Sequence, residues 1–124
     1  MNAFITSVSS YLPNNPVSNK EMEDYIGLIN NKQSRVKSVV LRQNGISNRY
    51  YALDKEHRIT HTNAEIAAAA ILNLKCDLND VEVLACATSC ADQILPGQAS
   101  MVHGLLKNAQ MELYSTAGVC LSGI

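Results

Sequence analysis

Apolar and polar positions along the chain predict a series of helices and strands. Residues 3–12 alternate loosely between the two kinds and predict a first strand. A proline-rich loop follows at 13–16, because proline supplies no N–H to a helix interior or a strand ladder. Ser18 with Glu21 is typical of a capping box and predicts a helix whose apolar face recurs at helical spacing until its stop at Asn30.

The next segments are shorter. Residues 34–42 predict a second helix that ends near Gly45, since Asn-Gly is a favoured helix stop. Residues 49–53 predict a short strand, and residues 54–58 predict a charged loop. This part of the chain is therefore expected to hold small elements joined by polar loops.

An alanine-rich helix is predicted next. Thr62 with Glu65 repeats the capping-box pattern, and residues 64–74 are almost all apolar. A helix that is apolar on nearly every side is expected to be buried between other elements, and its alanines permit close backbone approach. The alternative is an ordinary core helix.

The C-terminal part predicts alternating strands and helices. Residues 81–87 form a nearly continuous apolar run, as in a central strand of a parallel sheet. Residues 88–95 predict a loop, residues 98–106 a helix and residues 111–115 a further strand. This order predicts an α/β fold with right-handed crossovers.

The last stretch, Met111–Ile124, is the strongest candidate for chemistry. It passes from an apolar run through small residues to Cys120, with Gly118 and Ser122 two positions away on either side. Small neighbours are what a nucleophile needs at a sharp strand-to-helix corner. A cysteine that opens a helix also has a lowered pKa, which favours the thiolate. The alternative is a buried structural cysteine.

Composition excludes several classes of function. The 124 residues carry a formal net charge of -1, and 47% of them are hydrophobic. Nucleic acids and anionic membranes favour basic patches, which this balance does not suggest. The N-terminus lacks a basic start and a long apolar segment, so neither a signal peptide nor a membrane anchor is expected. We expect a soluble, cytoplasmic protein.

The other cysteines and the histidines suggest no metal site. Cys86 and Cys90 stand four positions apart without a nearby histidine, which does not fit zinc-site spacings, and Cys76 is remote from both. Disulfides are not expected in the cytosol. The histidines are interpreted as solvated, capping or packed side chains: His57, His61 and His103.

Two segments and one cysteine carry a family resemblance. Residues Asn44–Ala52, NGISNRYYA, resemble a "TGI-x-x-R-x-x-A" stretch, and residues Ala87–Pro96, ATSCADQILP, resemble an "AT-x-x-x-D-x-x-x-P" stretch. Cys120 follows at the distance of a nucleophilic cysteine. In this order the landmarks resemble 3-oxoacyl-(acyl-carrier-protein) synthase III, a condensing enzyme of the thiolase superfamily. The resemblance covers essentially the whole chain.

The resemblance implies a fold and a reaction. The fold would be the N-terminal half of a duplicated αβαβα thiolase-like architecture, over residues 1–124, truncated just after the nucleophile. Cys120 would attack an acyl thioester, acyl-CoA or acyl-carrier protein, and malonyl-acyl carrier protein would then be decarboxylated and condensed in fatty acid or related lipid or polyketide biosynthesis. No other cofactor is implied. The catalytic His and Asn would come from the absent half, so the fragment alone is expected to be inactive.

The resemblance also implies substrate-binding residues and a homodimer. Leu95, just before the proline, would cross the dimer interface to floor the partner's acyl pocket, with Ser89 and Thr88 near the same pocket. The pattern departs in two places: Val39 and Gln43 replace an aromatic residue and an arginine that hold CoA, and the nucleophile is followed by Leu-Ser-Gly. Two alternatives are acyl transfer to another acceptor and a catalytically silent subunit that retains the fold.

Overall fold

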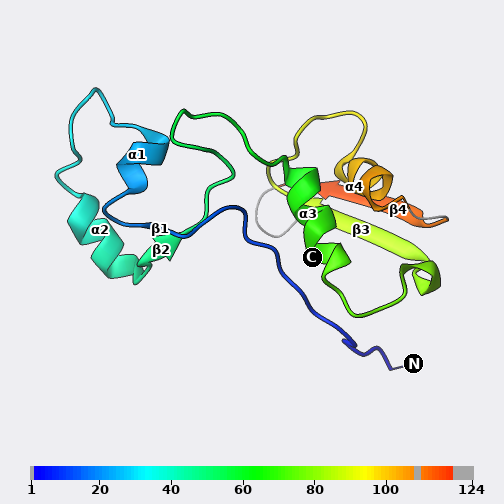
Figure 1. The fold of residues 1–124 in the computed structure, drawn as a ribbon. Coiled ribbons are helices and arrows are strands. Elements are labelled where there is room, and N and C mark those ends of the chain that lie inside the picture. Colours follow the sequence, from blue (N-terminus) through cyan, green and yellow to red (C-terminus); the bar gives the residue numbers. More distant parts are fainter. Residues whose placement is uncertain (1, 108–109, 119–124) are drawn as a thin grey trace. The chain divides into compact units, whose positions relative to one another are not determined.

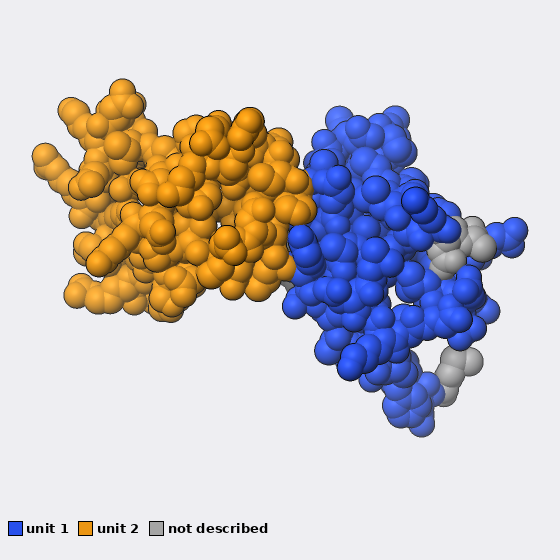
Figure 2. All heavy atoms as spheres, in the orientation of Figure 1, with its two compact units in different colours: residues 1–11, 62–124 blue, residues 12–61 orange. Residues whose placement is uncertain are grey.

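The computed structural model describes residues 2–107 and 110–118. The chain divides into two compact units, which Figure 2 shows in different colours. Unit 1 comprises Met1–Tyr11 and Thr62–Ile124, and unit 2 comprises Leu12–His61.

Unit 1 is built on a strand–helix–strand crossover (Figure 1). Strands β3 (Val83–Thr88) and β4 (Glu112–Ala117) pair in parallel, from Val83 opposite Glu112 to Thr88 opposite Ala117. Between them runs helix α4 (Gln98–Leu106). Helix α3 (Asn63–Leu72) and a 3-10 turn, η1 (Leu78–Asp80), precede β3. The predicted α/β order is confirmed. Two parallel strands require a crossover connection, and α4 supplies it.

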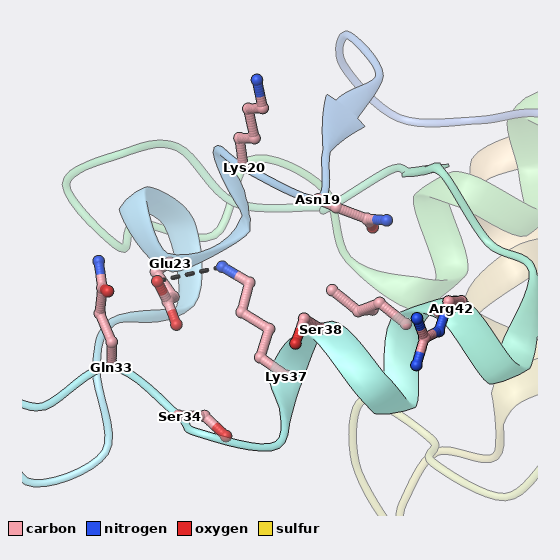
Figure 3. Close-up of a pocket in the computed structure, with 9 residues that line it drawn as sticks. Asn19, Lys20, Glu23, Gln33, Ser34, Lys37, Ser38 and Arg42 are labelled. Carbon is pink, nitrogen blue, oxygen red and sulfur yellow. Dashed lines mark ion pairs between the residues drawn. The ribbon is translucent and has the colours of Figure 1, made fainter.

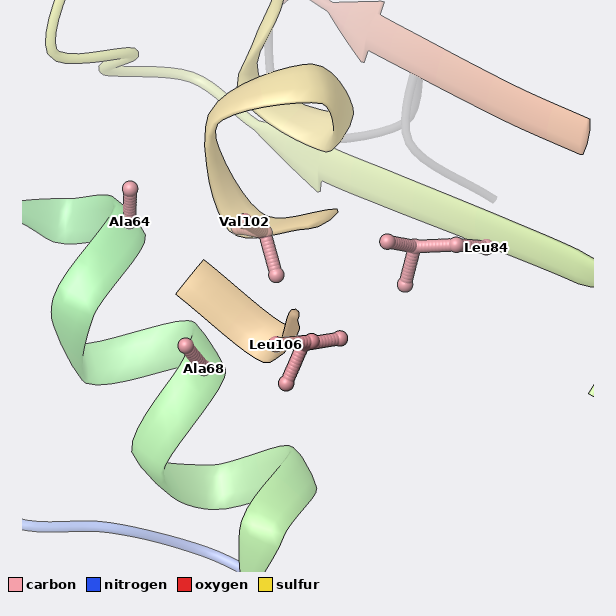
Figure 4. Packing of buried hydrophobic residues seen from close by; sticks show 5 residues of the cluster. All are labelled: Ala64, Ala68, Leu84, Val102 and Leu106. Atoms are coloured by element: carbon pink, nitrogen blue, oxygen red, sulfur yellow. The ribbon is translucent and has the colours of Figure 1, made fainter. Parts of the chain in front are cut away.

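The core of unit 1 lies where α4 packs against both α3 and the sheet. Its buried residues come from α3, β3 and α4, and Figure 4 shows them facing one another: Ala64, Ala68, Leu84, Val102 and Leu106. Val102 is fully buried at their centre. The two alanines of α3 place little volume between the helices, so the two backbones can approach closely. This packing holds the start of α4 beside the ends of the strands.

Helix α3 and strand β3, which the sequence predicts to be buried between other elements, are covered only in part by the described residues. Helix α3 buries Ala64 and Ala68, whereas Leu72 at its end is 61% exposed. Strand β3 alternates, with Leu84 buried and Val83 49% exposed. The reason is that α4 covers one face of the sheet, and no described element of unit 1 covers the other.

The prediction of a first strand at residues 3–12 is also wrong. The described part of this segment has no regular secondary structure, and Ile5 is 88% exposed. Hydrogen bonds hold it against α3 and the residue that follows this helix: Ser9 Oγ donates to the carbonyl of Ala70, and Asn73 Nδ2 donates to the carbonyl of Ser10 at 3.2 Å. A strand needs a ladder partner, and the described residues offer none here.

Unit 2 contains a short antiparallel pair and two helices (Figure 1). Strands β1 (Val17–Ser18) and β2 (Asn48–Arg49) pair antiparallel. Helix α1 spans Met22–Ile26 and α2 spans Lys37–Asn44. Helix α2 ends at Gly45, whose φ of 69° is left-handed, so the predicted Asn-Gly stop is confirmed.

Helix α1 is shorter than predicted. It ends at Gly27, which has a φ of 75°, before the predicted stop at Asn30. Glycine adopts this conformation without the steric cost that a side chain imposes. The capping-box contacts do form, since the main-chain N–H of Ser18 donates to Glu21 Oε2 at 3.2 Å and that of Glu21 donates to Ser18 Oγ at 3.4 Å. Ser18 itself lies in β1, however, and the helix begins at Met22.

Within the described part of the chain, no helix has the length and apolar character needed to cross a bilayer.

Candidate functional site

The carboxyl ends of β3 and β4 border a hollow of about 650 Å³ in unit 1. Ligands of open α/β sheets bind beyond the carboxyl ends of parallel strands, because the loops that leave the strands diverge there. The hollow is therefore the candidate site. Its lining comes from the loop after β3, the start of α4 and the end of β4: residues 88–94, 97–98 and 115–117.

Thr88, the last residue of β3, organises the loop. Its Oγ1 accepts hydrogen bonds from the main-chain N–H of Cys90 and from Asn63 Nδ2, both at 3.1 Å. Asn63 Nδ2 also donates to the carbonyl of Cys90 at 2.7 Å. These hydrogen bonds hold the beginning of the loop against Asn63, the first residue of α3.

Asp92 also connects this loop to the start of α3. Its carboxylate accepts hydrogen bonds from the main-chain N–H groups of Asn63 at 2.7 Å and Ala64 at 2.8 Å. The first N–H groups of a helix have no partner within the helix, and a negative charge there also interacts favourably with the helix dipole. Asp92 therefore supplements the capping box of Thr62 and Glu65, which is confirmed with both of its hydrogen bonds.

Ser115 of β4 caps α4 in the same manner. Its Oγ accepts a hydrogen bond from the main-chain N–H of Ala99 at 2.9 Å. Gly97, the residue before α4, lies against this hydroxyl. Both long helices of unit 1 thus receive a side-chain cap from another element, which fixes their starts relative to the strand ends.

Gln98 is the buried polar residue of the hollow. It is the first residue of α4 and only 4% exposed. Its Oε1 accepts from the main-chain N–H of Asp92 at 3.4 Å, and its Nε2 has no hydrogen-bond partner among the described residues. Sequence reasoning assigned no role to Gln98, Asp92 or Ser115. Only Asp92 carried a signal, because it belongs to the segment that resembles the family.

Two of the four residues predicted for the site line the hollow. Thr88, half-buried, and Ser89, exposed, both line the hollow. Leu95 is 82% exposed and does not line the hollow of its own chain. Cys120 lies outside the described residues, three positions after the last residue of β4.

The three described cysteines differ in burial. Cys76 and Cys90 are exposed and free. Cys86 is half-buried, and this burial raises the pKa of its thiol. No cluster of three or more His, Cys, Asp or Glu that could hold a metal ion occurs among residues 2–107 and 110–118.

Unit 2 has a separate, polar hollow of about 540 Å³ between α1 and α2 (Figure 3). Three cationic side chains line it: Lys20, Lys37 and Arg42. Lys37 Nζ forms an ion pair with Glu23 Oε2 at 3.0 Å, as the dashed line in Figure 3 marks. Excess positive charge beside a hollow attracts anions such as phosphates. Val39 and Gln43 do not line it.

The segment Asn44–Ala52 has a structural role in unit 2. Its Arg49 donates from Nη2 to Asn19 Oδ1, and Asn19 Nδ2 donates to the carbonyl of Ile46 at 3.0 Å. These contacts join β2 to the turn that follows β1. The segment therefore positions the elements on which the polar hollow is built.

The chain is similar in sequence to known proteins. No protein-family model matches the chain. The chain is 29% identical over 120 residues to beta-ketoacyl-(acyl-carrier-protein) synthase III of Rickettsia akari, which covers 97% of this chain and 35% of that protein. It is 31% identical over 121 residues to the enzyme of the same name from Roseobacter denitrificans, again over 97% of this chain and 35% of the relative. The chain thus spans about a third of the length of these curated relatives.

A solved structure shares the fold. The tetronic acid condensing enzyme AbyA1 superposes with a TM-score of 0.72 at 22% identity, over 94% of this chain and 36% of that chain. Beta-ketoacyl and 3-oxoacyl are two names for the same group, so the curated relatives carry the name of the enzyme family that the sequence motifs resemble. The chain is similar to beta-ketoacyl-(acyl-carrier-protein) synthase III along nearly its whole length, and it has the α/β fold of thiolase-like condensing enzymes, consistent with the N-terminal half of that fold.

Proposed function

We propose that the chain is the acyl-accepting part of a beta-ketoacyl synthase III-like condensing enzyme. The observation that carries the proposal is the sequence match over 97% of the chain to enzymes of that name. Because the match covers 35% of each relative, the activity is proposed for a longer protein or assembly that contains this chain. The chain alone is proposed to be inactive.

Cys120 would perform the first step. Its thiolate attacks the carbonyl carbon of an acyl thioester, and the carrier's sulfur leaves as a thiol after taking up a proton. A thiolate suits this exchange, because it is nucleophilic near neutral pH and is itself a good thioester partner. The main-chain N–H of the cysteine would contribute to an oxyanion hole for the tetrahedral intermediate.

Condensation would follow on the acyl-enzyme. Malonyl-acyl carrier protein loses carbon dioxide, the resulting carbanion attacks the acyl carbonyl, and the Cys120 thiolate is released. The His and Asn that assist decarboxylation are expected from the remainder of the protein. The proposed partners are therefore an acyl carrier protein, an acyl thioester and a second copy of the enzyme.

The hollow supports this proposal by its position. It lies at the carboxyl end of β4, the strand that leads toward Cys120, and both Thr88 and Ser89 line it. Leu95 is proposed to act across a dimer interface, which suits its exposure at 82%.

The departure after the nucleophile, Leu-Ser-Gly, favours a divergent branch. One alternative is therefore acylation of Cys120 followed by transfer to an acceptor other than malonyl-acyl carrier protein. The other is a catalytically silent subunit. The two are separated by whether Cys120 is acylated at all.

The test uses the full-length protein. It is incubated with acyl thioesters, and the adduct is mapped by peptide mass spectrometry, with Cys90→Ala as a matched control for Cys120→Ala. We expect acylation that persists in Cys90→Ala and disappears in Cys120→Ala. Acylation of Cys120 without product from malonyl-acyl carrier protein would favour the other acceptor, and the absence of any adduct would favour the silent subunit.

A further inference from the structure

Gln98 holds a buried hydrogen-bond donor without an acceptor. The residue is 4% exposed, and its Nε2 has no partner among the described residues. Its other polar atom, Oε1, accepts only a long hydrogen bond from Asp92 N–H, at 3.4 Å. Burying an amide donor is unfavourable unless it is bonded, and native structures rarely leave such groups unpaired. The amide therefore calls for an acceptor from elsewhere.

The side chains beside Gln98 are already engaged. The two carboxylate oxygens of Asp92 accept from the first N–H groups of α3, at 2.7 and 2.8 Å. Ser115 Oγ accepts from the N–H of Ala99 at 2.9 Å. Gln98 borders the hollow of about 650 Å³ together with these two residues. A ligand in the hollow is thus the natural source of an acceptor atom.

The lining of the hollow fits a ligand of mixed character. Ala91, Ile94 and Ala117 supply apolar surface, and Thr88, Ser89 and Thr116 supply hydroxyl groups. Ligand sites in proteins combine a largely apolar wall with a few placed polar groups that confer specificity. Gln98 differs from these hydroxyl groups because its side chain is buried and its Nε2 has no partner among the described residues.

We propose that Gln98 is a specificity-determining residue that donates from Nε2 to an oxygen carried on the acyl chain. This inference rests on the proposed acylation of Cys120. The site would favour hydroxyacyl or ketoacyl groups over plain hydrocarbon chains of equal length. A hydrocarbon chain leaves the amide unpaired, and sites built around a buried hydrogen-bonding group discriminate strongly against ligands that lack the partner.

The experiment measures a choice between two matched substrates. Full-length protein is offered an equal mixture of the N-acetylcysteamine thioesters of butanoate and 3-hydroxybutanoate, both enantiomers included, and the ratio of adducts on Cys120 is measured by mass spectrometry. We expect a preference for the hydroxylated chain of about tenfold, the scale set by one buried unsatisfied donor. Gln98→Met, which keeps length and removes the donor, should bring the ratio close to one.

The control is Gln93→Met. Gln93 lines the same hollow, but its side chain is exposed, so its loss should leave the preference unchanged. Should Gln98→Met misfold, as judged by circular dichroism, Gln98→Asn retains a donor with shorter reach and should lower the preference in the same direction.

The outcomes separate the two proposals. Loading with no preference, or with a preference that survives in Gln98→Met, overturns the role of Gln98 while Cys120 acylation stands. An equal loss of both loading rates in Gln98→Met also overturns it, because the acceptor would then lie in the shared part of the thioesters. If neither thioester loads, acylation fails, and Gln98 is judged by binding: a larger thermal shift with the hydroxylated thioester in wild type than in Gln98→Met supports it, and equal shifts overturn it.

Discussion

Gly97 and Ser115 lie in close contact at the start of α4. A Cβ atom placed on Gly97 would lie 2.7 Å from Ser115 Oγ and 3.1 Å from Ser115 Cβ. The same Oγ accepts the hydrogen bond from Ala99 N–H, so it cannot move away without uncapping the helix. The glycine is therefore required by space, since its backbone conformation before the helix is an ordinary extended one.

The first prediction concerns this contact. Gly97→Ala is expected to lower the free energy of unfolding by about 1–2 kcal/mol, because the new methyl group displaces the capping hydroxyl. Urea denaturation measures the change. Ser115→Ala removes the cap and should cost about 1 kcal/mol by itself. In the double variant the losses should be less than additive, and full additivity would show that the clash does not act through the hydroxyl.

The second prediction concerns Asp92. Asp92→Ala removes the acceptor of two N–H groups at the start of α3, and it should cost about 1 kcal/mol of the free energy of unfolding. Hydrogen exchange of Asn63 and Ala64 should become faster, because both amides lose their partner. The matched control is Asp80→Ala, because Asp80 is exposed and its side chain has no hydrogen bond or ion pair among the described residues. Equal effects of the two changes would contradict the capping role.

Much of the fold could be predicted from local sequence. Helix α4 was predicted over its observed residues because Pro96-Gly97 precedes a continuous helical pattern. The stop at Gly45 was predicted because the chemistry of a left-handed cap is local. Residues 3–12 were predicted wrongly, because their alternation shows a capacity to pair while the presence of a partner strand depends on the rest of the molecule.

Only part of the candidate site could be predicted, because many of its contacts join residues far apart in the sequence. The resemblance implies that Thr88 and Ser89 lie near the acyl pocket, and the structure shows that both line the hollow. That the hollow is the acyl pocket stays a prediction. The contacts of Asp92 with α3 and of Ser115 with α4 join residues 28 and 16 positions apart, which no local pattern encodes. Gln98 was interpreted only as the start of a helix, because its burial arises from packing in three dimensions.

The third prediction concerns the reactivity of Cys86. Burial raises the pKa of its thiol, and only the thiolate reacts with alkylating agents. At pH 8 iodoacetamide should therefore modify Cys86 more slowly than the exposed Cys76 and Cys90, as peptide mass spectrometry would measure. The rate at Cys86 should still rise with pH above the range where an ordinary thiol levels off. Equal rates at all three cysteines would contradict the burial of Cys86.

The fourth prediction concerns Leu95 and depends on the proposed homodimer. Leu95→Phe should shorten the acyl chain that the full-length enzyme accepts, because added volume in a filled pocket costs about 1–3 kcal/mol. Rates of Cys120 acylation with a series of acyl thioesters measure the profile. Leu72→Phe is the matched control, since Leu72 is also exposed, at 61%, and does not line the hollow, so this change should leave the profile unaltered. An unchanged profile in Leu95→Phe would exclude Leu95 from the pocket.

The last prediction concerns the uncovered face of the β3–β4 sheet. Leu84 and Cys86 face α4, whereas Val83, Ala85 and Ala87 alternate with them and are exposed. Parallel sheets are ordinarily covered on both faces, and a sizeable exposed apolar face favours association. The chain of 124 residues expressed by itself is therefore expected to associate with further copies, which sedimentation velocity measures as a species heavier than 13.5 kDa.

A single charge on that face should reverse the association. Ala85→Lys places an ammonium group at the middle of the open face, where burial against another apolar surface would leave it unpaired at high cost. The sedimentation coefficient should fall toward that of a monomer. Ala3→Lys, the same change at an exposed position outside the sheet, should leave association intact. A wild-type chain that is monomeric at the same concentration would show that this face needs no cover.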